Sequence, residues 1–359
     1  METVVVVVAG MGAHGVAEEV WRASPGSVLV RHDLSRLVDG VVRRWVDGVP
    51  TELSLAHGCL SCTLREDLLP LLASLAGRRV VLDLDPSLEP EAVCLALVDR
   101  GSIRVGSVVS VVDRATWLAD ATGEDTLGER GIGLPSDERT VAQVVVGHVE
   151  FADALVLTGP PGDEVLPAVL DRLAPGTPRF ELSSLEVSRL LAVPPGRRFT
   201  PAFAPLLRGA PEEPAHGVSV VRFTARRPFH PMRLHEAVDV LLDGVVRARG
   251  RLWVVSQPDR VMWLESAGGG LSVGAVGTWL AAVEDWSDVD AERRAFASLD
   301  WDPEFGDRSQ EVVAVCLRAS GEDVVAALGA ALVTDEELAL AAELEFADPF
   351  AEWHELEEL

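Results

Sequence analysis

The chain has 359 residues, of which 57 are acidic and 31 are lysine or arginine, so its formal net charge is −26. All of these basic residues are arginine, because the sequence contains no lysine. The absence of lysine excludes a P-loop or a Schiff-base enzyme of the usual kind, since both depend on a lysine amine. The acidic charge argues against direct binding of nucleic acid or of an anionic membrane surface.

The length predicts about two domains, each with its own core. An apolar run at residues 4–9 follows Glu2 and has no basic residue before it, so it predicts a buried strand rather than a signal peptide. No apolar run approaches the ~20 residues that a membrane helix needs. The 4 cysteines are too few for a disulfide framework in a chain of this length. We therefore expect a cytoplasmic protein without a membrane anchor.

Short apolar runs alternate with helical segments in the first half of the chain. Continuous apolar strands between helices are typical of a parallel sheet that is covered on both faces. This pattern predicts an α/β domain over residues 1–190. The predicted strands are residues 4–8, 27–30, 80–84, 107–112 and 154–157, and the predicted helices are residues 16–22, 64–76 and 89–99.

A proline-rich segment at residues 191–216 predicts a linker. After it, neighbouring strands with few helices predict a small α+β domain over residues 217–350, followed by an acidic tail at residues 351–359. The predicted strands are residues 218–224, 251–256, 261–266, 270–277 and 312–317, and the predicted helices are residues 231–242, 323–332 and 335–344, the last opened by a Thr334/Glu337 capping box.

Three glycines, Gly10, Gly12 and Gly15, follow the first strand at the spacing G-x-G-x-x-G. Between a strand and a helix, this spacing fits the phosphate-binding turn of dinucleotide-binding domains, and Asp33 stands where the ribose-binding acid would be. Two other interpretations also fit the glycines. They could simply allow a tight strand-to-helix turn, or they could be a degenerate P-loop.

A Cys-x-x-Cys pair, Cys59 and Cys62, is preceded by His57. Thr63 and Glu66 have the spacing of a capping box, so Cys62 precedes a helix N-terminus, whose partial positive charge favours the thiolate. Three such donors on one loop fit a zinc site, which takes about four ligands in a tetrahedral array. A redox-active dithiol uses the same helix start and remains an alternative.

The fourth ligand of such a site is left open, with His32, Asp33 and a water molecule as the candidates. The two other cysteines, Cys94 and Cys316, fall on a predicted helix and a predicted strand. A free cysteine on such an element behaves as a small apolar side chain, so we expect both in the core.

Arginines cluster in the second half of this acidic chain, and two histidines stand near the start of one predicted helix. The arginine clusters predict a partner surface, contacts with the acidic C-terminal segment, or solvated ion pairs of little energy. The histidines are expected to be polar helix residues rather than metal ligands. The residues concerned are Arg226, Arg227, Arg247, Arg249, Arg251, His230 and His235.

The stretch 58–68, Gly-Cys-Leu-Ser-Cys-Thr-Leu-Arg-Glu-Asp-Leu, resembles the signature G-C-x-C-C-T-L-R-x-D-L of the CobW-like metallochaperone GTPases, with Ser61 in place of the middle cysteine. Segments of the second half resemble the C-terminal domain of the same family, and this resemblance implies a P-loop-like parallel-sheet domain followed by an α+β CobW C-terminal domain. These segments are residues 225–231, 247–253, 263–269, 305–308 and 347–353.

The nucleotide motifs of that family are altered in this chain. Residues 10–16 lack the phosphate-binding lysine and the magnesium-binding hydroxyl, residues 83–86 replace E-S-x-G, and residues 158–161 replace the base-reading N-K-x-D. Such losses remove charge stabilisation, metal positioning and guanine selectivity together. The resemblance therefore implies a pseudo-GTPase, with Gly10, Gly12 and Gly15 as a degenerate phosphate loop, zinc as the bound metal and no useful GTP hydrolysis.

These departures most resemble the actinobacterial branch of the family, which recruits a ribosome hibernation factor when zinc is scarce. The resemblance implies a zinc-linked cytosolic adaptor that holds a basic partner protein and makes no direct contact with nucleic acid. Loss of zinc from His57, Cys59 and Cys62 would then be the switch. Two alternatives remain: a GTP-binding zinc metallochaperone that delivers metal to a client protein, and a Rossmann-type NAD(P)-binding oxidoreductase.

Overall fold

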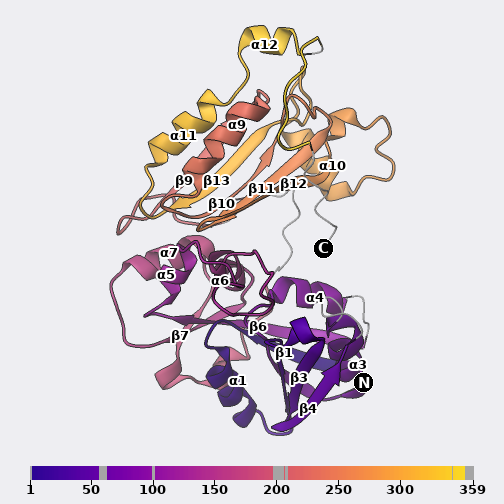
Figure 1. The fold of residues 1–359 in the computed structure, drawn as a ribbon, viewed down its shortest axis with the longest axis vertical. Coiled ribbons are helices and arrows are strands. Elements are labelled where there is room, and N and C mark those ends of the chain that lie inside the picture. Colours follow the sequence, from indigo (N-terminus) through magenta and orange to yellow (C-terminus); the bar gives the residue numbers. More distant parts are fainter. Residues whose placement is uncertain are drawn as a thin grey trace. The chain divides into compact units, whose positions relative to one another are not determined.

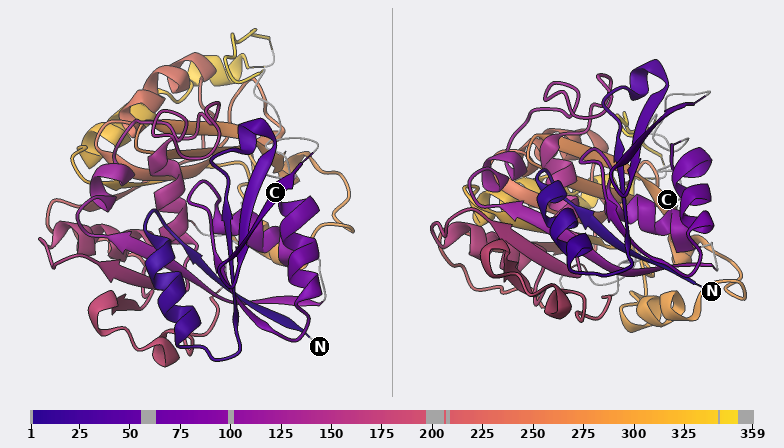
Figure 2. Two further views of the ribbon diagram at one scale, coloured as in Figure 1. Left: turned by 60° about the horizontal axis from the view of Figure 1, so that its bottom comes forward. Right: turned by 90° about the horizontal axis from the view of Figure 1, so that it is seen from below.

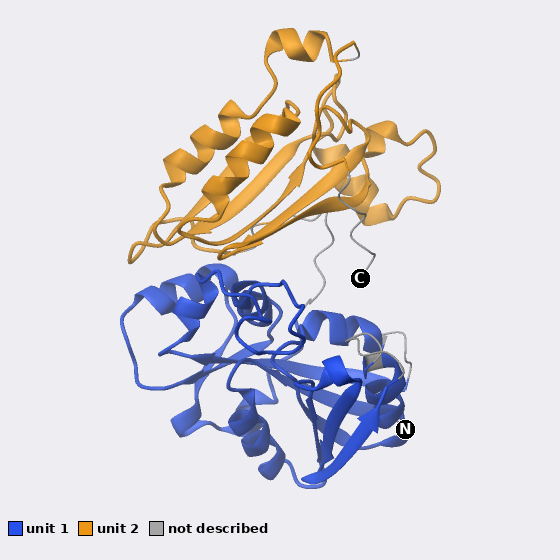
Figure 3. Cartoon of the chain, viewed as in Figure 1, with its two compact units in different colours: residues 1–199 blue, residues 200–359 orange. Residues whose placement is uncertain are grey.

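The computed structural model describes residues 2–55, 63–98, 102–196, 206, 209–341 and 343–351. The chain divides into two compact units, Met1–Phe199 and Thr200–Leu359 (Figure 3). The first unit is built on a mixed, largely parallel sheet with helices, and the second on an antiparallel sheet with helices (Figure 1). The predicted fold class, an α/β domain followed by an α+β domain, is confirmed.

The first unit contains an eight-stranded sheet in the order β4-β3-β2-β5-β1-β6-β7-β8. Its strands pair in parallel except at one edge, where β3 runs antiparallel to both β2 and β4. All five strands predicted for this half are present. The strands are β1 (Thr3–Ala9), β2 (Val28–Asp33), β3 (Val41–Val46), β4 (Val49–Ser54), β5 (Arg79–Asp83), β6 (Ile103–Asp113), β7 (Ala154–Thr158) and β8 (Arg179–Glu181).

The expectation of a purely parallel sheet is wrong at the β3–β4 hairpin. The two strands are joined by Asp47 and Gly48, with φ of 48° and 80°. Two consecutive residues with positive φ form the tight turn whose twist matches a hairpin, and Asp-Gly is a favoured pair for it. The hairpin was missed because β4 is mostly exposed and lacks the apolar run that marks the buried strands.

The valine run of β1 is buried because both faces of the sheet are covered. Val5 and Val7 pack in one core with residues of the helices that follow β4 and β5, such as Leu72. Val6 and Val8 pack in the opposite core with Val16 and other residues of the first helix. Figure 2 shows these helices on the two sides of the strands. Residues 4–9 of this strand are therefore apolar on both sides, which explains the continuous run.

The helix predicted at 64–76 is a π-helix, η2, followed by α3, which ends at Ser74. Pro70 lies in the first turn of α3; it cannot donate to the carbonyl four residues earlier, which explains the irregular helix before it. No helix in the described ranges is long and apolar enough to cross a membrane. The helices of the first unit are α1 (Ala13–Arg22), η1 (Leu37–Asp39), η2 (Leu64–Leu68), α3 (Leu69–Ser74), α4 (Pro90–Val98), α5 (Trp117–Ala121), α6 (Val141–Glu150), α7 (Val165–Leu173), η3 (Leu182–Ser184) and α8 (Val187–Leu190).

The second unit contains a five-stranded antiparallel sheet in the order β12-β11-β10-β13-β9. Helices α9 and α11 lie together over one face of it, and their apolar residues share a core with alternate residues of the strands (Figure 1). The elements are β9 (Ser219–Ala225), α9 (Pro231–Ala237), η4 (Val238–Leu241), β10 (Val245–Leu252), β11 (Arg260–Ala267), β12 (Gly270–Thr278), η5 (Leu280–Ala282), α10 (Ala291–Leu299), β13 (Gln310–Cys316), α11 (Gly321–Ala330) and α12 (Asp335–Ala339).

One predicted strand of the second unit is wrong. Residues 251–256 were expected to be extended, but β10 ends at Leu252. The Trp253 N–H then donates to the side chain of Gln310 at 2.9 Å, and Val254 pairs with Phe229 as an isolated bridge, so this segment leaves the sheet. The helix predicted at 335–344 ends at Ala339, although its predicted capping box is present.

Candidate functional site

The carboxyl ends of β1, β2 and β5 surround a cavity of about 360 Å³. Open α/β sheets bind their ligands at this edge of the strands. The cavity is lined by Gly10 and by ionisable side chains that include His14, Arg31, Asp83 and Asp85. It is the candidate functional site of the first unit.

The glycine turn at this site is short, because β1 ends at Ala9 and α1 begins at Ala13. Gly10 has a φ of +129°, and a Cβ at this position would lie 2.6 Å from the carbonyl oxygen of Val111, so only glycine fits. A Cβ on Gly12 or Gly15 would meet no atom within 4 Å. Of the three glycines predicted to form a degenerate phosphate loop, therefore, the backbone requires only Gly10.

His14 and Asp83 form the central polar contact of the site. His14 lies in the first turn of α1, and its Nδ1 is 2.6 Å from Asp83 Oδ2. Arg31 Nε, from β2, lies 3.8 Å from the same oxygen. Burial raises the pKa of Asp83, and the contacts with His14 and Arg31 oppose this rise only in part. The side chains that could meet an anion here are thus held by an internal carboxylate.

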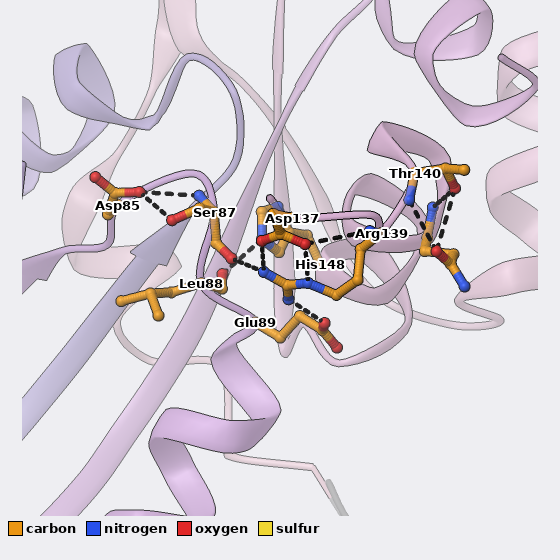
Figure 4. Close-up of polar contacts among 9 residues, drawn as sticks. Asp85, Ser87, Leu88, Glu89, Asp137, Arg139, Thr140 and His148 are labelled. Atoms are coloured by element: carbon orange, nitrogen blue, oxygen red, sulfur yellow. Dashed lines mark hydrogen bonds and ion pairs between the residues drawn. The ribbon is translucent and has the colours of Figure 1, made fainter. Parts of the chain in front are cut away.

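Asp85, in the segment that replaces E-S-x-G, accepts hydrogen bonds from groups of the surrounding loops. Its Oδ2 accepts a hydrogen bond from the Leu34 N–H at 2.9 Å. Its Oδ1 accepts hydrogen bonds from the N–H and the hydroxyl of Ser87 at 3.0 and 2.6 Å (Figure 4). These contacts fix the loops after β2 and β5 against each other.

Arg139 holds the loop between α5 and α6 against this site. It forms a two-point ion pair with Asp137 and also donates to Glu89 at 2.7 Å and to the carbonyl oxygen of Ser87 at 2.8 Å (Figure 4). The loop approaches so closely that a Cβ on Gly133 would lie 2.8 Å from the Cβ of Ser87. No apolar pattern marks this loop in the sequence, although the Thr140/Gln143 capping box that starts α6 after it is visible there.

The described residues of the site do not fit a magnesium-bound triphosphate. A P-loop wraps the phosphates with backbone N–H groups and reaches them with lysine, whereas this chain has a three-residue turn and no lysine. Phosphate oxygens in the cavity would also lie near two buried carboxylates, Asp83 and Asp85.

The predicted metal ligands His57, Cys59 and Cys62 lie outside the described residues. Within the ranges that the structure describes, no group of three or more His, Cys, Asp or Glu side chains could hold a metal ion. His32, one candidate for the fourth ligand, is buried on β2, and its Nε2 lies 2.7 Å from Asp67 Oδ2 on η2. Asp67 also forms an ion pair with Arg44.

The pairing with Asp67 bears directly on the candidate fourth ligands. A carboxylate that accepts from one ring nitrogen of a histidine orients the other nitrogen, an arrangement common for metal-binding histidines. Asp33 has a different role, since its carboxylate accepts from the Ser35 N–H at 2.9 Å. Burial alone would raise the pKa of Asp33, but the contacts with Ser35 and the charges of Arg31 and Arg43 lower it.

Both cysteines predicted to lie in the core are buried, with Cys94 and Cys316 each 1 % exposed. Burial raises the pKa of the Cys316 thiol to about 11, so it stays protonated near neutral pH. Neither residue joins a group of metal-binding side chains among the described residues.

The arginines of the second unit hold the acidic segment that follows Leu332. Arg227 donates to the carbonyl oxygen of Val333 at 3.0 Å and pairs with Asp335. Arg233 forms a two-point ion pair with Glu337, at 2.9 and 2.7 Å. Of the alternatives for the arginine clusters, contact with the acidic segment is thus observed at Arg227.

The two histidines near α9 are helix residues, as predicted. His230 is the N-cap of the helix, and its Nδ1 accepts from the Arg233 N–H at 3.5 Å. His235 is exposed and packs edge-on against Phe350, with ring centroids 6.0 Å apart.

The fold and the strand-end site define a P-loop-like α/β protein with an appended antiparallel α+β domain. The model of the "Cobalamin synthesis protein cobW C-terminal domain" matches residues 218–332. The chain is 44% identical to "Zinc chaperone Rv0106" of Mycobacterium tuberculosis, over 99% of this chain and 94% of that protein. It belongs to the CobW-like family of metallochaperone GTPases.

Two more distant similarities were found. "Zinc-regulated GTPase metalloprotein activator 1" of Dictyostelium discoideum is 25% identical, over 86% of this chain and 72% of that protein. The match to the solved structure of Zn(II)-bound YjiA GTPase from E. coli covers 92% of this chain and 99% of the YjiA chain. The two sequences are 13% identical, and the TM-score is 0.39.

Proposed function

We propose that this protein is a zinc-linked adaptor of the metallochaperone type whose strand-end site does not use GTP. The observation that carries the proposal is the occupation of that site by the chain's own side chains, with His14 Nδ1 2.6 Å from Asp83 Oδ2 just after a three-residue turn. The relatives named as a zinc chaperone and as a zinc-regulated GTPase metalloprotein activator support the link to zinc.

Zinc, as the cargo or signal, would bind His57, Cys59 and Cys62, with His32 as the fourth ligand. The contact between His32 Nε2 and Asp67 supports this choice, because it leaves Nδ1 as the ring nitrogen for a metal. Zinc content measured on the purified chain tests the site: Cys59→Ser, Cys62→Ser and His32→Ala should each lower it. Cys316→Ser is the matched control, since Cys316 is buried in the other unit. Equal zinc content in all the variants would contradict the site.

As an adaptor, the protein would act in the cytoplasm and hold a basic partner, which we propose to be a ribosome hibernation factor. The net charge of −26 supports a basic partner, because opposite charges steer association. Metal release would free the Cys59/Cys62 loop and so act as the switch.

An affinity pull-down from cells grown with and without a zinc chelator tests the adaptor proposal. We expect the factor to be recovered with the protein under zinc depletion, and expect Cys59→Ser to change the zinc dependence of its recovery. Recovery of a metalloenzyme client in place of the factor would contradict the adaptor and favour a chaperone.

A GTP-binding zinc metallochaperone is the second candidate. The cavity of about 360 Å³ at the strand ends favours it, because this is where α/β folds bind their ligands. It predicts a nucleotide affinity that changes when zinc binds, whereas the adaptor proposal predicts no nucleotide binding in either zinc state.

A further inference from the structure

An exposed apolar patch lies around α10 in the second unit (Figure 1). It consists of Trp286, Leu299 and Trp301, which we call the tryptophan patch. Leu299 is 84 % exposed and Trp301 is 43 % exposed. Exposed tryptophan is typical of the parts of protein interfaces that carry most of the binding energy. The proposed zinc ligands and the strand-end site belong to the first unit, so neither accounts for this patch.

Trp301 is held firmly by its neighbours. Its ring packs edge-on against that of Trp286, with ring centroids 5.4 Å apart. The Trp286 indole N–H donates to the carbonyl oxygens of Leu280 and Val283, at 3.2 and 3.1 Å. The chain turns beside Trp301 at Gly306, where a Cβ would lie 3.1 Å from the Trp301 ring. The indole is therefore preorganised, so a partner that covers it loses little conformational entropy.

Both tryptophans have an aspartate beside them in the sequence. Asp285 precedes Trp286, and Asp302 follows Trp301. The stretch that contains them, residues 284–304, has eight acidic residues and two arginines. The tryptophan patch therefore lies in a strongly acidic part of the chain.

Asp285 and Asp302 are exposed carboxylates that neutral groups hold in place. Asp285 accepts hydrogen bonds from the N–H and the hydroxyl of Ser287, at 2.9 and 3.0 Å. Asp302 accepts from the N–H groups of Glu304 and Phe305, at 2.8 and 2.9 Å. These hydrogen bonds lower the pKa of both carboxyls, so both are ionised at neutral pH. Neither forms an ion pair with a basic residue of the described ranges.

A third aspartate of the stretch is already compensated. Asp300 forms an ion pair with Arg226, whose charge also contributes to the lowered pKa of Asp302. With Arg226 included, three arginines stand against the eight acidic residues of the stretch. The surroundings of the tryptophan patch thus stay negative after the chain's own arginines are counted.

The charge around the patch selects the kind of partner. A second copy of this chain would bring a net charge of −26 towards an acidic surface, and nucleic acid or an anionic membrane would bring phosphates. An arginine side chain instead gains twice, because the face of an indole attracts a cation and a carboxylate forms a charge-assisted hydrogen bond with it. An apolar residue beside that arginine would cover Leu299.

We propose that the tryptophan patch is the docking surface for a basic segment of a partner protein, in which an arginine packs on Trp301 and pairs with Asp302 while a neighbouring apolar side chain covers Leu299. The surface deepens the proposed adaptor function and rests on it for the partner in the cell, since it gives the place where the basic partner docks. The two can fail separately, because docking is measured with a peptide and the adaptor function with the partner recovered from cells.

The probe for docking is the labelled peptide Arg-Leu-Arg-Phe-Arg-Leu, with binding to the full chain followed by fluorescence anisotropy. Physiological salt screens charges that lie more than about 8 Å apart. We expect Trp301→Ser to weaken binding by about tenfold, because it removes the indole. Asp302→Asn should weaken it by about threefold, since the amide oxygen can still accept the N–H groups of the turn but carries no charge. The peptide with serine in place of leucine and phenylalanine should bind about tenfold more weakly.

Two further variants separate a lost surface from a lost fold or from general attraction to an acidic protein. Leu299→Ser changes an exposed side chain and should weaken binding by about threefold without altering the circular dichroism spectrum. Asp323→Asn on α11 is the matched control for Asp302→Asn and should leave the affinity unchanged. No binding by the unmodified chain up to about 1 mM, or equal affinity of the unmodified chain and the folded patch variants, would overturn the docking surface.

The pull-down under zinc depletion, repeated with the double variant Leu299→Ser/Asp302→Asn, distinguishes the docking surface from the adaptor function. We expect recovery of the basic factor to fall with this variant. Undiminished recovery would overturn the patch as the docking surface and leave the adaptor function standing. Peptide binding at the patch without recovery of a basic factor by the unmodified chain would contradict the adaptor function and support the docking surface.

Discussion

Asp83 in the first unit and Glu337 in the second each contact a basic side chain, but their pKa values are shifted in opposite directions. Asp83 is 4 % exposed and faces His14, and burial raises its pKa. Glu337 is held by the two-point pair with Arg233 and by the N-terminus of α12, and these contacts lower its pKa to about 2. The charged form is therefore disfavoured at the strand-end site and favoured at the helix cap.

The opposite pKa shifts of Asp83 and Glu337 reflect different roles of the two contacts in the fold. The Arg233–Glu337 pair and the capping box stabilise a helix end near the surface. The His14–Asp83 pair instead keeps a carboxylate in a place where a nucleotide-binding protein would keep a phosphate. Variants of Glu337 therefore test a surface ion pair, whereas variants at the strand-end site test the contact between His14 and Asp83.

The largest effect is expected at the glycine turn of the strand-end site. Gly10→Ala should lower the free energy of unfolding by about 2–4 kcal/mol, since it combines a strained φ with a clash against the Val111 carbonyl. Gly12→Ala is the matched control and should change it by less than about 1 kcal/mol, because no atom lies within 4 Å of the added methyl group. Urea denaturation of the three proteins measures both values, and equal losses would contradict the required role of Gly10.

A smaller, pH-dependent effect is expected for Asp83→Asn. The pKa of Asp83 in the folded chain lies above its unfolded value of 3.8. Between these two pKa values the folded chain binds more protons than the unfolded chain, so the unmodified chain loses stability as pH rises from one to the other. The difference in melting temperature, variant minus unmodified chain, should therefore become more positive between pH 4 and neutral pH. A difference that falls over the same range would show that His14 outweighs burial.

The smallest effect is expected for Glu337→Gln, with the opposite sign. The folded pKa of about 2 lies below the ordinary 4.5, so the stabilisation is present above pH 4.5 and is lost as pH falls towards 2. The variant should be less stable by about 0.5–1 kcal/mol at neutral pH, as a partly exposed ion pair contributes little. This deficit should shrink as pH falls from 4.5 and vanish only below pH 2, which melting curves across the range would reveal.

The elements with a strong apolar pattern could be predicted from the sequence, and β1 with the turn at Gly10 is the best example. The β3–β4 hairpin could not be predicted from such a pattern, because β3 is only partly buried, β4 is largely exposed, and only the Asp47-Gly48 pair marks the hairpin. The strand expected at 251–256 was wrong because Trp253 is drawn out of the sheet by Gln310, a contact across 57 positions.

At the candidate site, too, local features could be predicted from the sequence, whereas contacts between distant residues could not. The sequence indicated the missing lysine and the position of the turn, but it could not indicate that His14 pairs with Asp83, 69 positions away. Nor could it reveal Arg139, whose partners Ser87 and Glu89, in the loop before α4, are brought near only by the fold. Contacts of this kind depend on the strand order, which local patterns do not contain.

The central claim is that this member of the CobW-like family has a strand-end site closed to nucleotide. Calorimetric titration of the full chain with magnesium-GTP, in the zinc-bound and zinc-free states, tests it most directly. We expect no binding in either state up to about 1 mM, because the turn lacks the lysine and the series of backbone N–H groups that hold phosphates in a P-loop. A micromolar dissociation constant in either state would contradict it.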